Sequence, residues 1–176
     1  MDTGLLVLRI VAGLFFAGHG AQKLFGWFRG PGPEAAGGFF EQLGYRPGRQ
    51  MVAVASLTEI GAGLMLAAGF LAPLAGAAIV GVMINAIWTV KRSLGLYNGY
   101  EIDLLYATIA VALAFAGPGV HSADAALGWS LVGTEWGLGA LALGLVTALG
   151  VLASRRVPRP VEVTPTEEEA EESEAA

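Results

Sequence analysis

The sequence predicts an all-α integral membrane protein built as a bundle of transmembrane helices. Three observations predict this class: the composition, the length of the apolar runs and the placement of the basic residues. Of the 176 residues, 55% are hydrophobic and only 14% are charged, whereas about a quarter are charged in a typical soluble domain. Five apolar runs approach or exceed the roughly 20 residues needed to cross a bilayer as a helix.

The five runs are expected to be five spans. The first run is apolar through Phe16 and then becomes partly polar, and the second is interrupted by one acid, Glu59. The third begins at Pro73, a residue favoured in the first turn of a helix. The fourth is short, because a Gly-Pro-Gly sequence stops it, and the fifth is rich in Ala, Leu and Gly. The expected spans are residues 4–28, 48–70, 73–90, 100–116 and 134–153.

The first two spans are connected by a segment with a helical pattern of its own. After a Gly-Pro-Gly-Pro break, apolar residues recur at helical spacing across residues 36–43, opposite Glu34 and Glu41. This pattern is typical of a short amphipathic helix at the membrane interface. An ordinary surface turn with incidental aromatic residues is the alternative.

Small residues repeat every four positions in two of the spans. In lipid, helices associate through close backbone approach, which small residues permit. We therefore expect both ladders to be packing faces within the bundle. The ladders are Gly13/Ala17/Ala21 and Ala140/Gly144/Ala148.

The basic residues predict the orientation in the membrane. With five spans, nine of the ten Lys and Arg residues fall on one side, Arg9 being the exception. Cytoplasmic loops concentrate Lys and Arg, so the sequence predicts a multi-pass protein of the cell (plasma) membrane with its N-terminus outside and its C-terminus in the cytoplasm. A four-span alternative would place three C-terminal arginines outside and break this pattern. No basic segment precedes the first run, which is therefore expected to be a retained span and not a signal peptide.

The net charge of −5 has two separate sources. Seven of the fifteen acidic residues follow Pro160, and the rest of the chain has ten basic against eight acidic residues, a charge of +2. The segment 158–176 has three prolines and too little apolar surface to offset the cost of ordering. It is expected to be a disordered acidic tail.

Several kinds of chemistry are excluded or disfavoured. The absence of cysteine excludes disulfides, iron–sulfur clusters and cysteine-ligated zinc, and the absence of a basic stripe beside aromatic residues disfavours nucleic-acid binding. No metal site is expected, because the only other histidine, His121, falls in a loop on the opposite side from His19. No cofactor site is evident in the chain, and a quinone is the alternative.

Eight polar residues gather in the cytoplasmic half of the predicted bundle. An ionisable side chain within a span costs about 2.5–3.5 kcal/mol, so each requires a partner or a water-filled site. Glu59 lies deepest, and His19 or Lys23 is its expected charge partner. If the residues converge, they form a cleft that is entered from the cytoplasm. The candidates are His19, Gln22, Lys23, Glu59, Asn85, Asn98, Glu101 and Asp103.

Each candidate also has a structural explanation. Lys23 could extend to the lipid headgroups, and His19 could be a packing residue. Glu101 and Asp103 could complement the dipole at the start of a helix. Even a His19/Glu59 pair could serve only to hold helices together.

The residues also form a known pattern. In order, the chain contains Leu8-Arg9-Ile10, Gly18-His19-Gly20-Ala21-Gln22-Lys23-Leu24-Phe25-Gly26, Gly38-Phe39-Phe40 with Leu43-Gly44, Glu59-Ile60-Gly61-Ala62-Gly63-Leu64, Asn98-Gly99-Tyr100-Glu101, and Gly117-Pro118-Gly119 with Ser122 and Asp124. Over residues 4–128 the sequence resembles the DoxX family of bacterial and archaeal membrane proteins. The resemblance implies a four-helix membrane bundle, so a fifth span and an acidic tail would be additions. The expected organisation is a bundle at residues 1–128, a fifth helix at 129–157 and the tail at 158–176.

The resemblance implies a role near redox chemistry. The family takes its name from a subunit of a thiosulfate:quinone oxidoreductase or terminal oxidase system, and a relative is associated with a complex containing a superoxide dismutase. We therefore expect an accessory or anchoring subunit of a membrane redox or oxidative-stress complex, with redox proteins as partners at the cytoplasmic face. The alternatives are a quinone-binding oxidoreductase subunit and a small-molecule or proton-coupled carrier. No catalysis by this chain alone is expected, and catalytic residues are not assigned.

Overall fold

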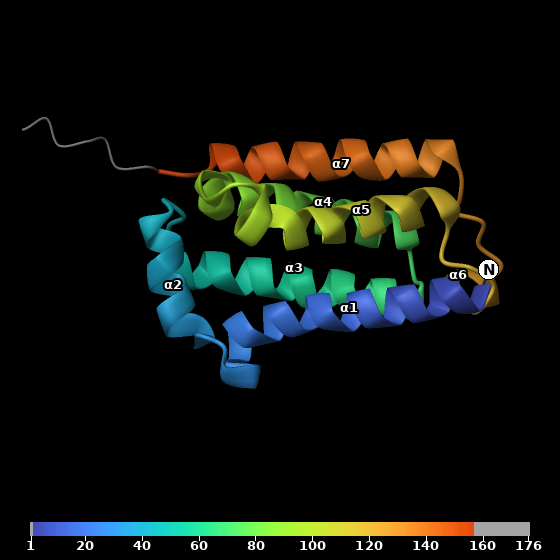
Figure 1. The fold of residues 1–176 in the computed structure, drawn as a ribbon, viewed down its shortest axis with the longest axis horizontal. Coiled ribbons are helices and arrows are strands. Elements are labelled where there is room, and N and C mark those ends of the chain that lie inside the picture. Colours follow the sequence, from blue (N-terminus) through green and yellow to red (C-terminus); the bar gives the residue numbers. More distant parts are fainter. Residues whose placement is uncertain (1, 157–176) are drawn as a thin grey trace, which may run out of the picture.

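The computed structural model describes residues 2–156, and all the regular elements in that range are helices (Figure 1). The predicted disordered tail at 158–176 lies outside the described residues. Short 3-10 or π turns occupy Trp27–Arg29, Ile87–Lys91, Arg92–Leu94 and Leu96–Tyr100. The α-helices are α1 (Asp2–Phe25), α2 (Gly32–Gln42), α3 (Gly48–Ala68), α4 (Ala72–Ala86), α5 (Glu101–Ala116), α6 (Ala123–Ala126) and α7 (Thr134–Ala153).

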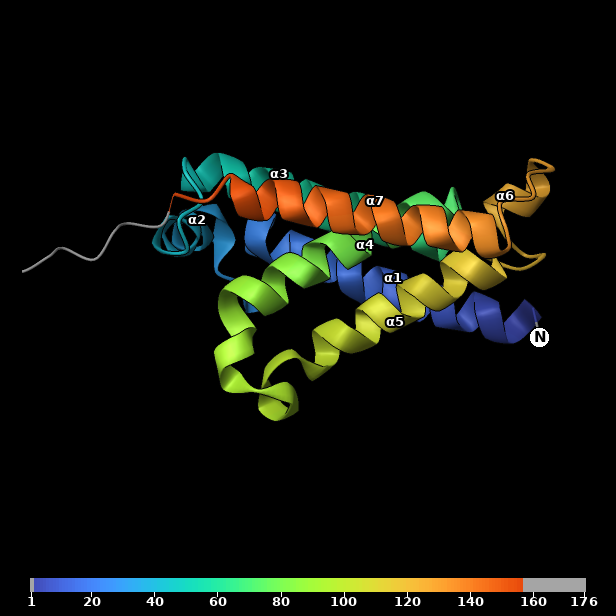
Figure 2. The same ribbon diagram turned by 90° about the horizontal axis from the view of Figure 1, so that it is seen from above.

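Within residues 2–156, five helical segments are long and apolar enough to cross a membrane, which confirms the predicted five spans. They are Asp2–Phe25, Gly48–Ala68, Ala72–Leu94, Leu96–Ala116 and Thr134–Ala153. They run side by side, with α4 packed against α3, α5 and α7 (Figures 1 and 2). The protein is therefore an all-α bundle, as its sequence predicts.

Two backbones approach closely where α1 crosses α3. A Cβ atom at Gly13 would lie 2.4 Å from the carbonyl oxygen of Gly63, and one at Gly63 would lie 2.5 Å from the carbonyl oxygen of Gly13. Only glycine fits this crossing, because each backbone occupies the space that the other helix's side chain would need. Ala17 and Ala21 continue the buried face of α1, which confirms the first small-residue ladder.

The second ladder packs α7 against α4. Ala140, Gly144 and Ala148 are all buried, and a Cβ atom at Gly144 would lie 2.9 Å from the carbonyl oxygen of Ala77. The predicted packing role of this ladder is therefore also confirmed, and the fifth span is an integral part of the bundle.

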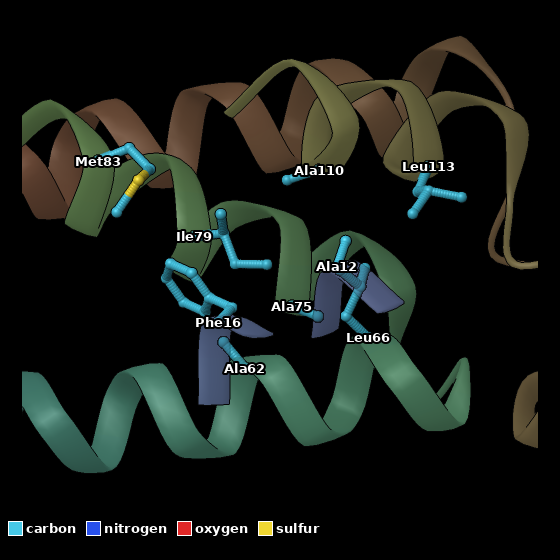
Figure 3. Close-up of a cluster of buried hydrophobic side chains, with 9 residues drawn as sticks. All are labelled: Ala12, Phe16, Ala62, Leu66, Ala75, Ile79, Met83, Ala110 and Leu113. Carbon is cyan, nitrogen blue, oxygen red and sulfur yellow. The ribbon is translucent and has the colours of Figure 1, made fainter. Parts of the chain in front are cut away.

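An apolar core fills the middle of the bundle (Figure 3). Phe16 of α1 lies next to Ile79 of α4, and Leu113 of α5 closes the far side. α4 contributes three of the nine buried core residues, consistent with its central position. The core members are Ala12, Phe16, Ala62, Leu66, Ala75, Ile79, Met83, Ala110 and Leu113.

The bundle has two different ends. The N-terminus of the chain, the short helix α6 and its loops lie at one end, and α2 lies across the other, where α7 also finishes (Figure 1). The connections at the α2 end carry most of the basic residues, in agreement with the sidedness seen in the sequence. This arrangement places the two ends of the described chain on opposite sides of the bundle.

The third span departs from the expected single regular helix. α4 ends at Ala86, and a π turn continues it to Lys91. The hydroxyl group of Thr89 donates a hydrogen bond to the carbonyl oxygen of Asn85 at 2.7 Å, a bond that competes with regular helix bonding. From this point α4 and α5 diverge towards the hairpin that joins them (Figure 2).

The glycine crossing generates a stability prediction. Replacing Gly63 with Ala forces the new methyl group against the backbone of α1, and such overpacking costs about 1–3 kcal/mol. We expect the melting temperature in detergent to fall by roughly 3–10 °C.

Gly61→Ala is the matched control, since it adds the same methyl group to the same helix at a position with nothing within 4 Å. That variant should melt at the temperature of the unaltered protein or slightly higher, because alanine favours helix. Equal effects of the two variants would contradict the assigned crossing.

Candidate functional site

A cavity of about 680 Å³ lies in the half of the bundle next to α2. Residues from α1, α2, α3, α4, α5 and α7 line it, most of them apolar. The structure brings six of the eight candidate residues to its wall, and they are His19, Gln22, Lys23, Glu59, Asn85 and Asp103. We call this cavity the cytoplasmic-half pocket, after the predicted orientation.

An ion pair between Lys23 and Glu59 joins α1 to α3 at the pocket wall. The Glu59 side chain is 4% exposed and the Lys23 side chain 24%. Of the two expected partners, Lys23 therefore holds the carboxylate, while the aliphatic part of its side chain lets the ammonium group remain near the pocket opening. The Oε2 atom of Glu59 is buried and has no hydrogen-bond partner among the described residues.

Close helix packing brings the two charges together. A Cβ atom at Gly20 would lie 2.6 Å from the carbonyl oxygen of Ser56 and 3.1 Å from Cβ of Glu59. The absence of a side chain at Gly20 therefore lets α1 approach the helical turn that carries Glu59. Lys23 is one turn further along α1 and reaches the same carboxylate.

A second ion pair lies at the mouth of the α4–α5 hairpin. Lys91 Nζ is 2.6 Å from Asp103 Oδ2, and the side chains are 33% and 6% exposed. As in the first pair, the carboxylate is buried and the lysine reaches outward. Each of these two buried carboxylates at the pocket is thus paired with the ammonium group of a lysine.

Asn85 is occupied by hydrogen bonds within the bundle. Its side-chain amide donates to the carbonyl oxygens of Gly81 at 2.9 Å and Ala148 at 3.4 Å. Its Oδ1 atom accepts a bond from the hydroxyl group of Tyr45 at 2.9 Å. Asn85 therefore links α4, α7 and the segment between α2 and α3.

Aromatic side chains form one wall of the pocket. The ring of Tyr106 lies 5.5 Å from that of Phe16 and meets the ring of His19 edge-on at 6.1 Å, measured between ring centroids. His19 is exposed and lines the pocket beside Gln22. Its imidazole is thus available to a molecule in the pocket.

The other two candidates lie outside the pocket lining. Asn98 adopts a left-handed conformation with φ of 62°, and its backbone N–H donates to Oε2 of Glu101 at 2.7 Å. This bond closes the turn that precedes α5. This geometry agrees with the structural explanation given for Glu101, in which its carboxylate complements the dipole at the start of a helix.

The predicted amphipathic helix also faces the pocket. α2 confirms the expected helical segment, and the four apolar residues on its predicted face line the cavity: Ala36, Phe39, Phe40 and Leu43. The helix thus forms part of the pocket wall.

A polar cluster at the opposite end was not selected from the sequence. Arg9 is 1% exposed and donates from Nη1 to the carbonyl oxygen of Ala67 at 2.8 Å and from Nη2 to that of His121. Asp124, also 1% exposed, accepts bonds from the backbone N–H groups of Leu71 and Ala72 at the start of α4. The cost of a charge within a span applies to Arg9 as it does to Glu59, and that signal would have found it.

The pocket offers binding and proton-holding groups. Among residues 2–156, no three His, Cys, Asp or Glu side chains come together as they would around a metal ion. The available groups are one carboxylate with a free oxygen, two paired lysines, one histidine and the Tyr106 phenol. Together with the apolar walls, this combination of a few polar groups and apolar surface is typical of a small-molecule site.

The Lys23–Glu59 pair generates a double-mutant prediction. Lys23→Met leaves a carboxylate buried without its partner, which should lower the free energy of unfolding by about 2 kcal/mol or more. Glu59→Gln should cost less, because the remaining lysine can still reach water. The double variant should recover most of the loss, and denaturant unfolding in mixed micelles measures all four proteins. Strictly additive losses would contradict the assigned pair.

Comparison with known proteins identifies the family. The model of the DoxX family matches residues 4–92, which cover α1 to α4 and the turn that follows, including the Lys23–Glu59 pair. No curated protein and no solved structure matches the chain. The matched region is half of the chain, and it contains the motifs around His19 and Glu59 that carry the resemblance. The chain belongs to the DoxX family of membrane proteins.

Proposed function

We propose that this DoxX-family protein is an accessory subunit of a redox or oxidative-stress complex in the plasma membrane, and that it binds a quinone-like molecule in the cytoplasmic-half pocket. The observation that carries the proposal is the pocket itself, which combines apolar walls with a buried, half-satisfied carboxylate. A simple membrane anchor needs no such cavity. We therefore favour an accessory subunit that binds a quinone over a subunit that only anchors the complex to the membrane.

The size and walls of the pocket fit a ring-bearing lipid-soluble molecule. Small-molecule sites in proteins typically enclose about 300–1,000 Å³, and this pocket encloses about 680 Å³. The ring of Tyr106 lines the pocket and is backed by the buried ring of Phe16 at 5.5 Å between centroids, and aromatic faces pack well against flat rings. Its place among membrane-spanning helices would admit a molecule dissolved in the bilayer.

The charges favour a neutral molecule over an anion. Both lysines at the wall are already paired with carboxylates, so little net positive charge remains to hold an anion. Lys23 can donate a hydrogen bond to a carbonyl oxygen of the ring. The free Oε2 atom of Glu59 can accept a bond from a hydroxyl group and hold a proton there.

A bound quinone would supply two-electron redox chemistry, with the electrons coming from a partner protein. The residues of this chain would position the ring and exchange protons through Glu59, with His19 at the outer side of the pocket. In this proposal the chain acts as an accessory subunit that relies on its partner for the electrons.

The α2 end of the bundle is suited to partners in the cytoplasm. The arginines Arg29, Arg46, Arg92 and Arg156 are exposed there, and basic residues favour the cytoplasmic side of membrane proteins. We therefore assign this end to the cytoplasm and the N-terminus to the outside. Redox proteins with acidic docking faces are the partners that this surface favours.

A binding measurement tests the quinone proposal. The purified protein in nanodiscs is titrated with a short-chain benzoquinone, and binding is followed by the quenching of intrinsic fluorescence. With the reduced form of the same compound, whose hydroxyl group can donate to Oε2 of Glu59, Glu59→Gln should raise the dissociation constant about tenfold or more, as expected for one lost hydrogen bond to a charged group.

Glu135→Gln is the matched control, because it makes the same chemical change in an exposed residue of the first turn of α7, at the other end of the bundle. It should leave the dissociation constant unchanged. Absence of quinone binding by the unaltered protein, or equal effects of both substitutions, would refute the proposal.

Cysteine labelling tests the orientation, since the natural chain has no cysteine. A membrane-impermeant maleimide should label the Ser130→Cys protein in intact cells. It should label the Gln42→Cys protein only after the membrane has been permeabilised. The reverse pattern would overturn the assigned orientation.

A further inference from the structure

We infer that the C-terminal end of α7 is a clamp that positions α2 and Tyr45 as a wall of the pocket, with Arg155 as its main positioning residue. The inference rests on the proposed function in so far as the pocket binds a ligand. It assigns a role to the fifth helix, which lies entirely beyond the family match at residues 4–92.

Two consecutive arginines hold the segment that joins α2 to α3. Arg155 Nε donates a hydrogen bond to the carbonyl oxygen of Leu43 at 2.8 Å, and its guanidinium carbon lies 5.6 Å from the centre of the Tyr45 ring. The backbone N–H of Arg156 donates to the carbonyl oxygen of Gly44 at 2.8 Å. Three successive residues of the segment are thus contacted by Arg155 and Arg156, which lie more than a hundred positions away in the chain.

Tyr45 extends the clamp to α4. Its side chain is 4% exposed, its hydroxyl group donates to Oδ1 of Asn85 at 2.9 Å, and its ring packs against Phe40 of α2 at 5.7 Å. Burial raises the pKa of the Tyr45 phenol, although the nearby Arg155 charge lowers it in part. The phenol therefore remains protonated at neutral pH and keeps its donor role.

The residues held by the clamp are pocket residues. Phe40, Leu43, Tyr45 and Asn85 all line the cavity, and α7 adds Thr147 and Val151 to its wall. A further hydrogen bond joins α2 to α3 nearby, from the N–H of Gly48 to Oε1 of Glu41 at 3.0 Å. Neither of these two residues lines the pocket. The contacts of Arg155 and Arg156 therefore hold the C-terminal part of α2, which lines the pocket.

The first half of α2 is held by few side-chain contacts: an exposed ion pair joins Glu34 to Arg49 of α3 at 3.1 Å, a kind of pair that adds little stability, and the backbone at Gly37 packs closely against Gly48. The connector from α1 contains left-handed residues at Gly26, Phe28, Arg29 and Gly32, and within α2 only Ala36 and Gly37 are buried. A helix with so few buried residues depends on contacts at its ends to keep one position. Loss of the clamp should consequently loosen α2 and leave the rest of the bundle intact.

Hydrogen–deuterium exchange of the full-length protein in nanodiscs tests the clamp without any ligand. Arg155→Ala removes both side-chain contacts, and deuterium uptake across residues 32–47 should rise about tenfold in rate, which corresponds to about 1.4 kcal/mol of local opening. Uptake across α1 and α4, and the melting temperature, should stay close to those of the unaltered protein.

Arg156→Ala is the matched control, because it removes the same charge from the neighbouring position and keeps the backbone N–H that bonds to Gly44. It should leave uptake across residues 32–47 unchanged. Tyr45→Phe is a milder second variant that removes only the bond to Asn85 and should give an intermediate increase. If Arg155→Ala has no more effect on this segment than Arg156→Ala, the clamp is overturned.

Titration with the short-chain benzoquinone separates this inference from the proposed function. Arg155→Ala should weaken quinone binding several-fold even though Arg155 does not line the pocket. Faster exchange in a protein that binds no quinone would support the clamp and refute the quinone proposal. Unaltered exchange in a protein that does bind quinone would refute the clamp alone.

Discussion

The cost of placing charges in hydrocarbon governs the positions of the polar residues. A charged side chain within a span needs a partner, and the protein supplies one from a different element in each case. Lys23 pairs with Glu59 across α1 and α3, and Lys91 pairs with Asp103 across the α4–α5 hairpin. Arg9 instead donates from its two Nη atoms to backbone carbonyl groups at the opposite end, while its buried Nε has no partner among the described residues. Each of these charged groups therefore also joins two segments. The apolar core (Figure 3) separates the two ion pairs, which lie at the pocket in the α2 half, from Arg9 towards the other end.

These pairings require backbones that approach closely, and small residues provide that approach. At Gly13 and Gly63 the α1 and α3 backbones leave no room for a side chain, and Gly20 has the same role beside Glu59. The ion pair and the glycine crossing are thus parts of one arrangement, since the first needs the distance that the second creates. Where α4 and α5 diverge past the π turn, the packing opens and the pocket lies between them and α2.

The fold was largely predictable from the sequence, and the candidate site only in part. Hydropathy indicated the five spans, and four-residue spacing indicated the packing faces, because both patterns are local along the chain. The cost of intramembrane charge selected Glu59 and Lys23 for the same reason. It could not distinguish Lys23 from His19 as the partner, because both lie on one face of α1 and the choice depends on how α3 is rotated. The backbone N–H of Asn98 donates to the side chain of Glu101 within a turn. The sequence alone could not distinguish this local hydrogen bond from a position in the pocket wall.

The sequence by itself therefore determined that this is a membrane protein of helices, where the five spans lie to within a few residues, which faces pack, and which residues carry a charge that must be satisfied. Only the tertiary structure decided how those residues combine. The pocket draws its wall from six helices, and the fifth span closes it through contacts between residues 112 positions apart. Contacts of that range leave no periodic signal in the chain, because they depend on the relative placement of whole helices.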